Sequence, residues 1–167
     1  MTLGHPAFVS LDAPTLVEAS AGTGKTYNIT RIYIRLLLER QLDVKNILVM
    51  TFTRAATEEL RGRIAREIRN ALNNWGQLIT EDGFFAALAE RFQLHDVYPV
   101  LHNALLSLDE AAIFTIHSFC KRVLTQQAFS SGVPFNMQME ADTMEIELEA
   151  VRDWYRSLAS QAQEYEI

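Results

Sequence analysis

The chain has 167 residues, a hydrophobic composition of 49% and a formal net charge of −6 at pH 7. Its apolar content suffices for a folded core, and its longest apolar runs are far below the roughly 18 residues that indicate a membrane span. The lone Cys120 excludes an internal disulfide and a multi-cysteine metal site, and no secretory leader opens the chain, so we expect a cytoplasmic protein without a membrane partner.

Charge is distributed unevenly along the chain. Residues 1–75 hold ten Lys/Arg against seven Asp/Glu, whereas residues 76–167 hold five against fourteen. The overall acidic balance alone argues against a nucleic-acid binder, but the basic first part and the acidic second part suit different partners. The acidic part is either a solvated helical surface or a protein docking face.

The first predicted elements flank a glycine-rich loop. Residues 1–14 are expected to form an irregular lead-in to a strand at about residues 15–19, and a helix is predicted from about residue 24 to residue 40. We expect the charged side chains of this helix to lie away from the core: Arg31, Arg35 and Glu39. Its apolar residues fall at helical spacing on one face: Ile29, Ile32, Tyr33, Leu36 and Leu37.

The loop between them, Glu-Ala-Ser-Ala-Gly-Thr-Gly-Lys-Thr at residues 18–26, has the features of a phosphate-binding loop. Small residues let successive backbone N–H groups approach a polyphosphate, and the following helix adds its positive end. Lys25 would bridge the β- and γ-phosphates of ATP, and the Thr26 hydroxyl would hold Mg²⁺. Ala19 occupies the usual first glycine position. The alternative is a glycine-rich turn that caps an ordinary helix. The residues expected to bind nucleotide are Ala19, Ser20, Ala21, Gly22, Thr23, Gly24, Lys25 and Thr26.

A polar link at residues 41–45 precedes a continuous apolar run at residues 46–52, which predicts a strand buried on both faces. Such strands occur in parallel sheets flanked by helices, so the expected fold class is α/β. A second helix is predicted from Thr53 to about Leu72, with Glu59 and Arg63 as a stabilising i,i+4 pair.

The remaining elements are expected to be mostly helical. Residues 73–83 indicate a connection, and short helices are predicted at residues 84–93 and 97–106. Residues 107–110 have capping-box spacing, and a third strand is predicted at residues 113–116, followed by a helix from His117. A break at residues 131–134 separates it from a final acidic helix at residues 142–158.

The expected strand ends carry three motifs, at residues 21–26, 51–56 and 115–119. Open parallel sheets bind ligands at the carboxyl ends of their strands. The second and third motifs contain hydroxyl, aromatic, imidazole and guanidinium groups, which suit phosphates and stacked bases. Five polar or charged residues lie just past these ends, but neither motif is a nucleotide site by itself: Thr51, Thr53, Arg54, His117 and Lys121.

Three stretches closely resemble superfamily 1 helicases of the UvrD/RecB type. They are Glu-Ala-Ser-Ala-Gly-Thr-Gly-Lys-Thr, Thr-Phe-Thr-Arg-Ala-Ala-Thr-Glu-Glu-Leu-Arg-Gly-Arg-Ile and Ala-Ala-Ile-Phe-Thr-Ile-His-Ser-Phe-Cys-Lys-Arg. The resemblance covers nearly the whole chain. It implies a RecA-like P-loop NTPase fold, incomplete here, in an ATP-dependent 3′→5′ DNA helicase and exonuclease subunit. Such a subunit acts with RecC and RecD on single-stranded and duplex DNA ends in double-strand-break repair and homologous recombination.

The resemblance also implies roles for particular residues. Lys25 and Thr26 would serve catalysis. DNA would contact two motifs, with these residues: Thr51, Phe52, Thr53, Arg54, Thr115, His117 and Ser118. Phe52 could instead be a core residue, and His117 a buried histidine.

The resemblance further implies two domains and an incomplete catalytic site. Residues 1–132 would be the N-terminal part of motor domain 1A, and residues 133–167 the beginning of helical insertion 1B. The family's water-polarising D-E-x-Q-D pattern does not occur in the sequence, so we expect a chain that is inactive alone. Two alternatives remain open, a P-loop nucleotide kinase and a non-catalytic module that docks partner subunits.

Overall fold

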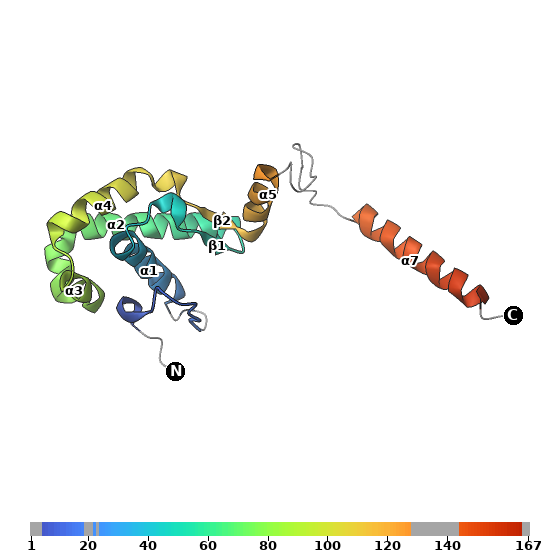
Figure 1. The fold of residues 1–167 in the computed structure, drawn as a ribbon, viewed down its shortest axis with the longest axis horizontal. Coiled ribbons are helices and arrows are strands. Elements are labelled where there is room, and N and C mark those ends of the chain that lie inside the picture. The colour runs from blue at the N-terminus through green and yellow to red at the C-terminus, as the bar shows by residue number, and fades with distance from the viewer. Residues whose placement is uncertain (1–4, 19–21, 23, 128–143, 165–167) are drawn as a thin grey trace. The chain divides into compact units, whose positions relative to one another are not determined.

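The computed structural model describes residues 5–18, 22, 24–127 and 144–164. Two compact units are distinguished, Met1–Arg122 and Val123–Ile167. The helices, shown in Figure 1, are α1 (Lys25–Glu39), α2 (Arg54–Glu81), α3 (Gly83–Ala89), α4 (Leu94–Leu106), α5 (Ile116–Gln126) and α7 (Met144–Glu164). The strands are β1 (Val49–Thr51) and β2 (Ile113–Thr115), and the 3₁₀ turns are η1 (Pro6–Phe8), η2 (Val44–Asn46) and η3 (Leu108–Glu110).

The core of the first unit lies between helices. Helices α1, α2 and α4 contact one another, and α3 packs on α2. Apolar residues recur at helical spacing on the facing sides, which is why these segments fold as amphipathic helices. Fully buried side chains come from each of the four helices: Ile34, Ile64, Ile68, Leu88 and Leu101.

The two strands pair in parallel, with Val49 opposite Ile113 and Thr51 opposite Thr115. The parallel pairing confirms that part of the α/β prediction, but the described chain is mostly helical and its sheet has two strands. The expected burial of both faces of β1 is wrong. Met50 is half exposed because α2 packs against the strands and no described helix covers that side chain.

The predicted strand before the glycine-rich loop is not present at residues 15–18, which have no regular secondary structure. Leu16 is exposed, and the sheet formed by the described residues consists of β1 and β2 only. A strand requires a hydrogen-bonded neighbour, and none of the described segments supplies one here. The last residue of the prediction, Ala19, lies outside the described residues.

The prediction of a connection at residues 73–83 is also wrong, because α2 continues to Glu81. The helix bends at Asn74, whose φ and ψ are −127° and 23°, and then continues. Trp75 is buried and meets the Phe85 ring edge-on, with ring centroids 5.7 Å apart. This packing outweighs the low helix propensity of asparagine and glycine in the segment. Asp82 then caps α3 by accepting a hydrogen bond from the Phe84 N–H.

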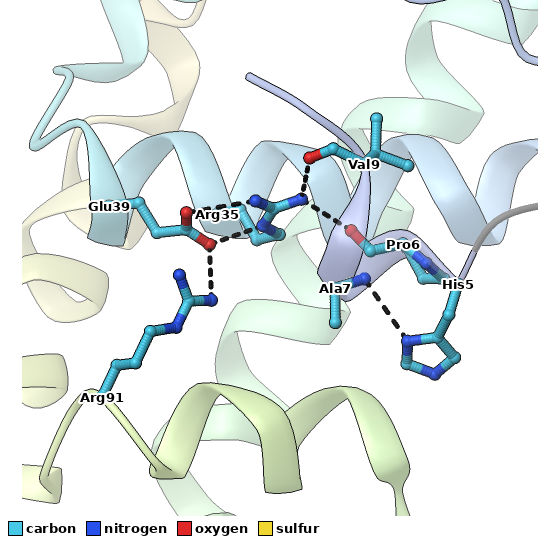
Figure 2. A network of polar contacts seen from close by, with 7 residues as sticks. All are labelled: His5, Pro6, Ala7, Val9, Arg35, Glu39 and Arg91. Carbon is cyan, nitrogen blue, oxygen red and sulfur yellow. Dashed lines mark hydrogen bonds and ion pairs between the residues drawn. The ribbon is translucent and has the colours of Figure 1, made fainter. Parts of the chain in front are cut away.

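Two arginines that we expected away from the core are buried. Arg31 lies beside three aromatic rings, 4.5–4.8 Å from their centroids, and pairs with Glu67 and Asp82 at 2.8 Å. Arg35 donates to the carbonyl oxygens of Pro6 and Val9, at 2.8 and 2.6 Å (Figure 2). Buried guanidinium groups require such partners. These contacts fasten η1 to α1 and join α1 to α2 and α3.

Several other predictions are confirmed. Helix α1 and strand β2 lie where expected, and Glu59 pairs with Arg63 at 2.6 Å. The capping box predicted at residues 107–110 is not formed, because the Ser107 side chain makes no cap hydrogen bond, and the 3₁₀ turn η3 follows it. In the second unit, α7 agrees with the predicted acidic helix over residues 144–158. The expected break at residues 131–134 and the expected domain boundary at residue 132 lie outside the described residues. None of the helices described is long and apolar enough to span a membrane.

Candidate nucleotide and DNA site

The glycine-rich loop has left-handed backbone conformations that match its sequence. Gly22 and Gly24 have φ values of 78° and 85°, in a region that a side chain would disfavour. Gly24 is the N-cap of α1 and has no side chain with which to cap it. The first amide groups of α1 therefore have no intrahelical acceptor, and they form an anion-binding end.

Two residues of the predicted site, Lys25 and Thr26, are the first residues of this helix. Lys25 is exposed and forms no ion pair with any residue that the structure describes, so its ammonium group is available to a ligand. Thr26 is half-buried in the first turn. Both side chains thus lie at the positive end of the α1 dipole. Four predicted nucleotide-binding residues lie outside the described part of the chain: Ala19, Ser20, Ala21 and Thr23.

Threonine hydroxyl groups form a set of hydrogen bonds at the end of β1. The Thr53 Oγ1 accepts a hydrogen bond from the Ala56 N–H and caps α2, at 3.1 Å. Thr51 donates to the Thr53 carbonyl and shares a 2.6 Å hydrogen bond with Thr57. We did not predict Thr57 as part of this site, although its position four residues after the N-cap Thr53 was a usable signal. Phe52 is 86% exposed between these threonines and is not a core residue.

The end of β2 repeats this arrangement. Thr115 accepts a hydrogen bond from the Ser118 N–H, and the two hydroxyl groups lie 2.8 Å apart at the start of α5. His117 is exposed, so it is not the buried histidine of the alternative interpretation. The Arg122 guanidinium lies over the Phe114 ring, 5.3 Å from its centroid. We did not predict a role for Arg122, although it is the last residue of the third stretch that carries the family resemblance.

The sheet register brings the second and third motifs together, because Thr51 and Thr115 are directly paired. Exposed Phe52 and Arg54 follow one strand, and exposed His117 follows the other. This surface combines hydroxyl donors, an aromatic face and cationic groups, which are the chemical groups that bind a nucleic-acid backbone and stacked bases. Residues 15–18, which precede the glycine-rich loop, do not form a strand of the sheet that contains β1 and β2.

No group of three or more His, Cys, Asp or Glu side chains capable of holding a metal ion occurs among the residues described. A magnesium ion at Thr26 would therefore take most of its ligands from phosphate oxygens and water, as Mg²⁺ commonly does. The uncapped helix end, the two left-handed glycines and exposed Lys25, which pairs with none of the described carboxylates, fit a magnesium-bound polyphosphate.

The chain is similar to known proteins over most of its length. Residues 5–166 match the UvrD/REP helicase N-terminal domain. The protein named RecBCD enzyme subunit RecB of Haemophilus influenzae is 38% identical over 167 aligned residues, which cover 91% of this chain and 14% of that protein. The same subunit of Escherichia coli K12 is 40% identical, over 90% of this chain and 14% of that protein. In Chlamydia trachomatis it is 41% identical, over 70% of this chain and 12% of that protein.

The chain thus spans about one seventh of the length of the first of these relatives. The matched region includes α1, both strands and the motifs at their ends. Because the domain match covers almost the entire sequence, the resemblance that the three motifs indicated is confirmed, and the chain belongs to the UvrD/REP helicase family.

Proposed function

We propose that this chain is the ATP-binding part of an ATP-dependent 3′→5′ DNA helicase and exonuclease subunit. The parent protein would act with RecC and RecD on DNA ends, in double-strand-break repair and homologous recombination in the cytoplasm. Family membership supports this proposal, together with the name of the RecB relatives. Residues 1–132 would form the N-terminal part of motor domain 1A and residues 133–167 the beginning of insertion 1B.

The start of α1 carries the nucleotide-binding part of the proposal. Gly22 and Gly24 adopt left-handed conformations, the helix has no side-chain cap, and Lys25 projects from its first turn without an ion-pair partner among the described residues. A glycine-rich turn that served only to cap a helix would not require, at this position, a lysine that has no ion pair with any described residue. The backbone amides would bind phosphate oxygens, Lys25 would neutralise the β- and γ-phosphates, and Thr26 would contribute a hydroxyl ligand to Mg²⁺.

DNA would lie across the ends of β1 and β2. Thr51, Thr53, Thr115 and Ser118 supply hydroxyl groups there, but several of them already bond one another. Three exposed side chains therefore remain available to single-stranded DNA: Phe52 would stack on a base, and Arg54 and His117 would contact phosphates. Coupling between the two sites would require the remainder of the motor.

Calorimetric titration with MgATP tests the nucleotide site. Lys25→Ala should remove nearly all measurable affinity, because it deletes the cation placed at the phosphates. Lys45→Ala is the matched control, since Lys45 is also exposed but pairs with Glu110. Equal affinities of wild type and Lys25→Ala would show that the loop is only a helix cap. ATP turnover that requires a small phosphate acceptor would instead support the nucleotide kinase alternative.

A further inference from the structure

A pocket lies at the opposite end of α1 from the glycine-rich loop. It has a volume of about 410 Å³, within the range of small-ligand sites. Helix α1 has 15 residues, so at a rise of about 1.5 Å per residue the pocket lies roughly 20 Å from Lys25. It is therefore separate from the proposed nucleotide site. We call it the helix-end pocket.

The floor of the helix-end pocket is apolar and comes from α1, α4 and the segment that follows α1. Five side chains form it: Leu37, Leu42, Val44, Val100 and Ala104. Leu37, Val44 and Ala104 are buried and belong to the hydrophobic core, so this surface is fixed by packing. Such a floor accommodates an aliphatic chain.

The rim of the pocket carries one acidic side chain and the C-terminal ends of two helices. Helices α1 and α4 both end at it, since Gln41 and Ser107, which follow their last residues, line it. Each helix brings the equivalent of about half a negative charge to its C-terminal end. Asp43 adds a full negative charge and is exposed at the rim. None of the lining residues is basic, and of the two basic residues that flank this segment, Arg40 pairs with Asp12 and Lys45 pairs with Glu110 at 2.5 Å.

The backbone at the rim turns sharply after α1. Gln41 has a φ of 51° and is the one non-glycine residue with positive φ in the described chain. The Leu42 N–H that follows it donates to the Leu36 carbonyl and closes the end of α1. Exposed Gln41 and Asn103 line the pocket together with Asp43, and their side-chain amide oxygens can accept hydrogen bonds.

We propose that the helix-end pocket binds an alkylguanidinium or alkylammonium group. The aliphatic stem would lie on the apolar floor, and the cation would be held by Asp43, by the amide oxygens of the rim and by the two helix ends. An arginine or lysine side chain of another polypeptide and a free small cation both present this chemistry.

Titration of the ¹⁵N-labelled 167-residue chain with n-butylguanidinium, followed by ¹H–¹⁵N correlation spectra, tests the proposal. The expected result is saturable shifts of the amide signals of Gln41, Leu42 and Asn103 that weaken with added salt. N-butylurea, which has the same shape without the charge, should leave them unchanged. Equal shifts with N-butylurea, or no shift at these residues, would overturn the proposal. A blocked Gly-Arg-Gly peptide that binds more tightly identifies a polypeptide source, and equal affinity identifies a small molecule.

Two variants locate the cation. Asp43→Asn should weaken binding about threefold to tenfold, and it keeps an oxygen that can accept from the Lys45 N–H as Asp43 does now. Asp109→Asn, an exposed aspartate that does not line this pocket, is the matched control. Gln41→Glu adds a charge at the rim and should tighten binding, a gain that misfolding cannot produce. Unchanged affinity in both Asp43→Asn and Gln41→Glu would refute the assignment.

Discussion

The buried Arg35 network provides a quantitative test of how the N-terminal segment is held on α1 (Figure 2). Arg35 donates to the carbonyl oxygens of Pro6 and Val9 and pairs with Glu39 at 2.5 Å. Arg35→Met keeps most of the aliphatic stem but removes every one of these donors. Glu39 retains Arg91 as a partner at 2.9 Å. We therefore expect a loss of about 2–4 kcal/mol in the free energy of unfolding, below the full cost of stranding a buried charge.

The measurement is urea unfolding followed by tryptophan fluorescence. The chain has two tryptophans, so Trp154→Phe in α7 leaves Trp75, buried in the first unit, as the single reporter. With a typical urea slope of about 2 kcal/mol/M, the midpoint should fall by about 1–2 M. Arg91→Met is the matched control, because Arg91 reaches the same carboxylate from a side chain that is 45% exposed. Its expected cost is about 0–1 kcal/mol.

The reasoning fails if Arg35→Met and Arg91→Met lower the unfolding free energy by the same amount. That result would mean that water replaces the guanidinium at the Pro6 and Val9 carbonyl oxygens without penalty. It would also mean that the burial of Arg35 does not determine how much this side chain contributes to the free energy of unfolding.

Two further predictions concern acid sensitivity and DNA binding. Burial raises the pKa of Glu39, but hydrogen bonds from Arg35 and Arg91 outweigh it, so the folded-state pKa lies below the ordinary 4.5. The stabilisation from this carboxylate is therefore complete above pH 4.5 and is lost as the pH falls through the lower folded-state value. Glu39→Gln should flatten that part of the profile of unfolding free energy against pH, and an unchanged slope would contradict the assignment. In fluorescence anisotropy, the chain should bind labelled single-stranded DNA weakly, and affinity should fall with salt. Arg54→Ala should reduce this binding and Arg63→Ala, which is paired with Glu59, should not; equal binding by all forms would exclude this face.

Local sequence patterns predicted the helices and strands whose own residues determine them. The stripe of apolar residues in α1 and the short apolar run of β2 correspond to elements in the structure. The elements that were missed depend on distant partners. Residues 73–81 are helical because Trp75 packs on Phe85, ten residues later, and no local pattern contains that information. Residues 15–18 have strand-like composition but no described neighbour with which to pair.

The candidate site shows the same division. The glycine pattern was interpreted only as space for a ligand beside the backbone, and the left-handed conformations of Gly22 and Gly24 are ones that glycine adopts without a steric cost. The burial of Arg31 was not anticipated, because charge alone suggests an exposed position. Its partners, Glu67 and Asp82, lie 36 and 51 residues away in the sequence. Tyr27, four residues before Arg31, supplies one ring of its aromatic surroundings and was the only nearby signal.

The 167-residue chain alone should neither hydrolyse ATP nor unwind DNA. Hydrolysis requires a group that orients water and cations that stabilise the transferred phosphoryl, and one arginine finger can contribute about 10³–10⁵ in rate. The single Asp-Glu pair in the sequence, Asp109-Glu110, lies before β2 begins, whereas the motif residue Thr115 lies at the opposite end of that strand. Glu110 is moreover paired with Lys45. A phosphate-release assay with and without single-stranded DNA should give the same background rate for wild type and Lys25→Ala. Turnover by wild type that Lys25→Ala abolishes would mean that a complete catalytic site is present among residues to which we assign no catalytic role.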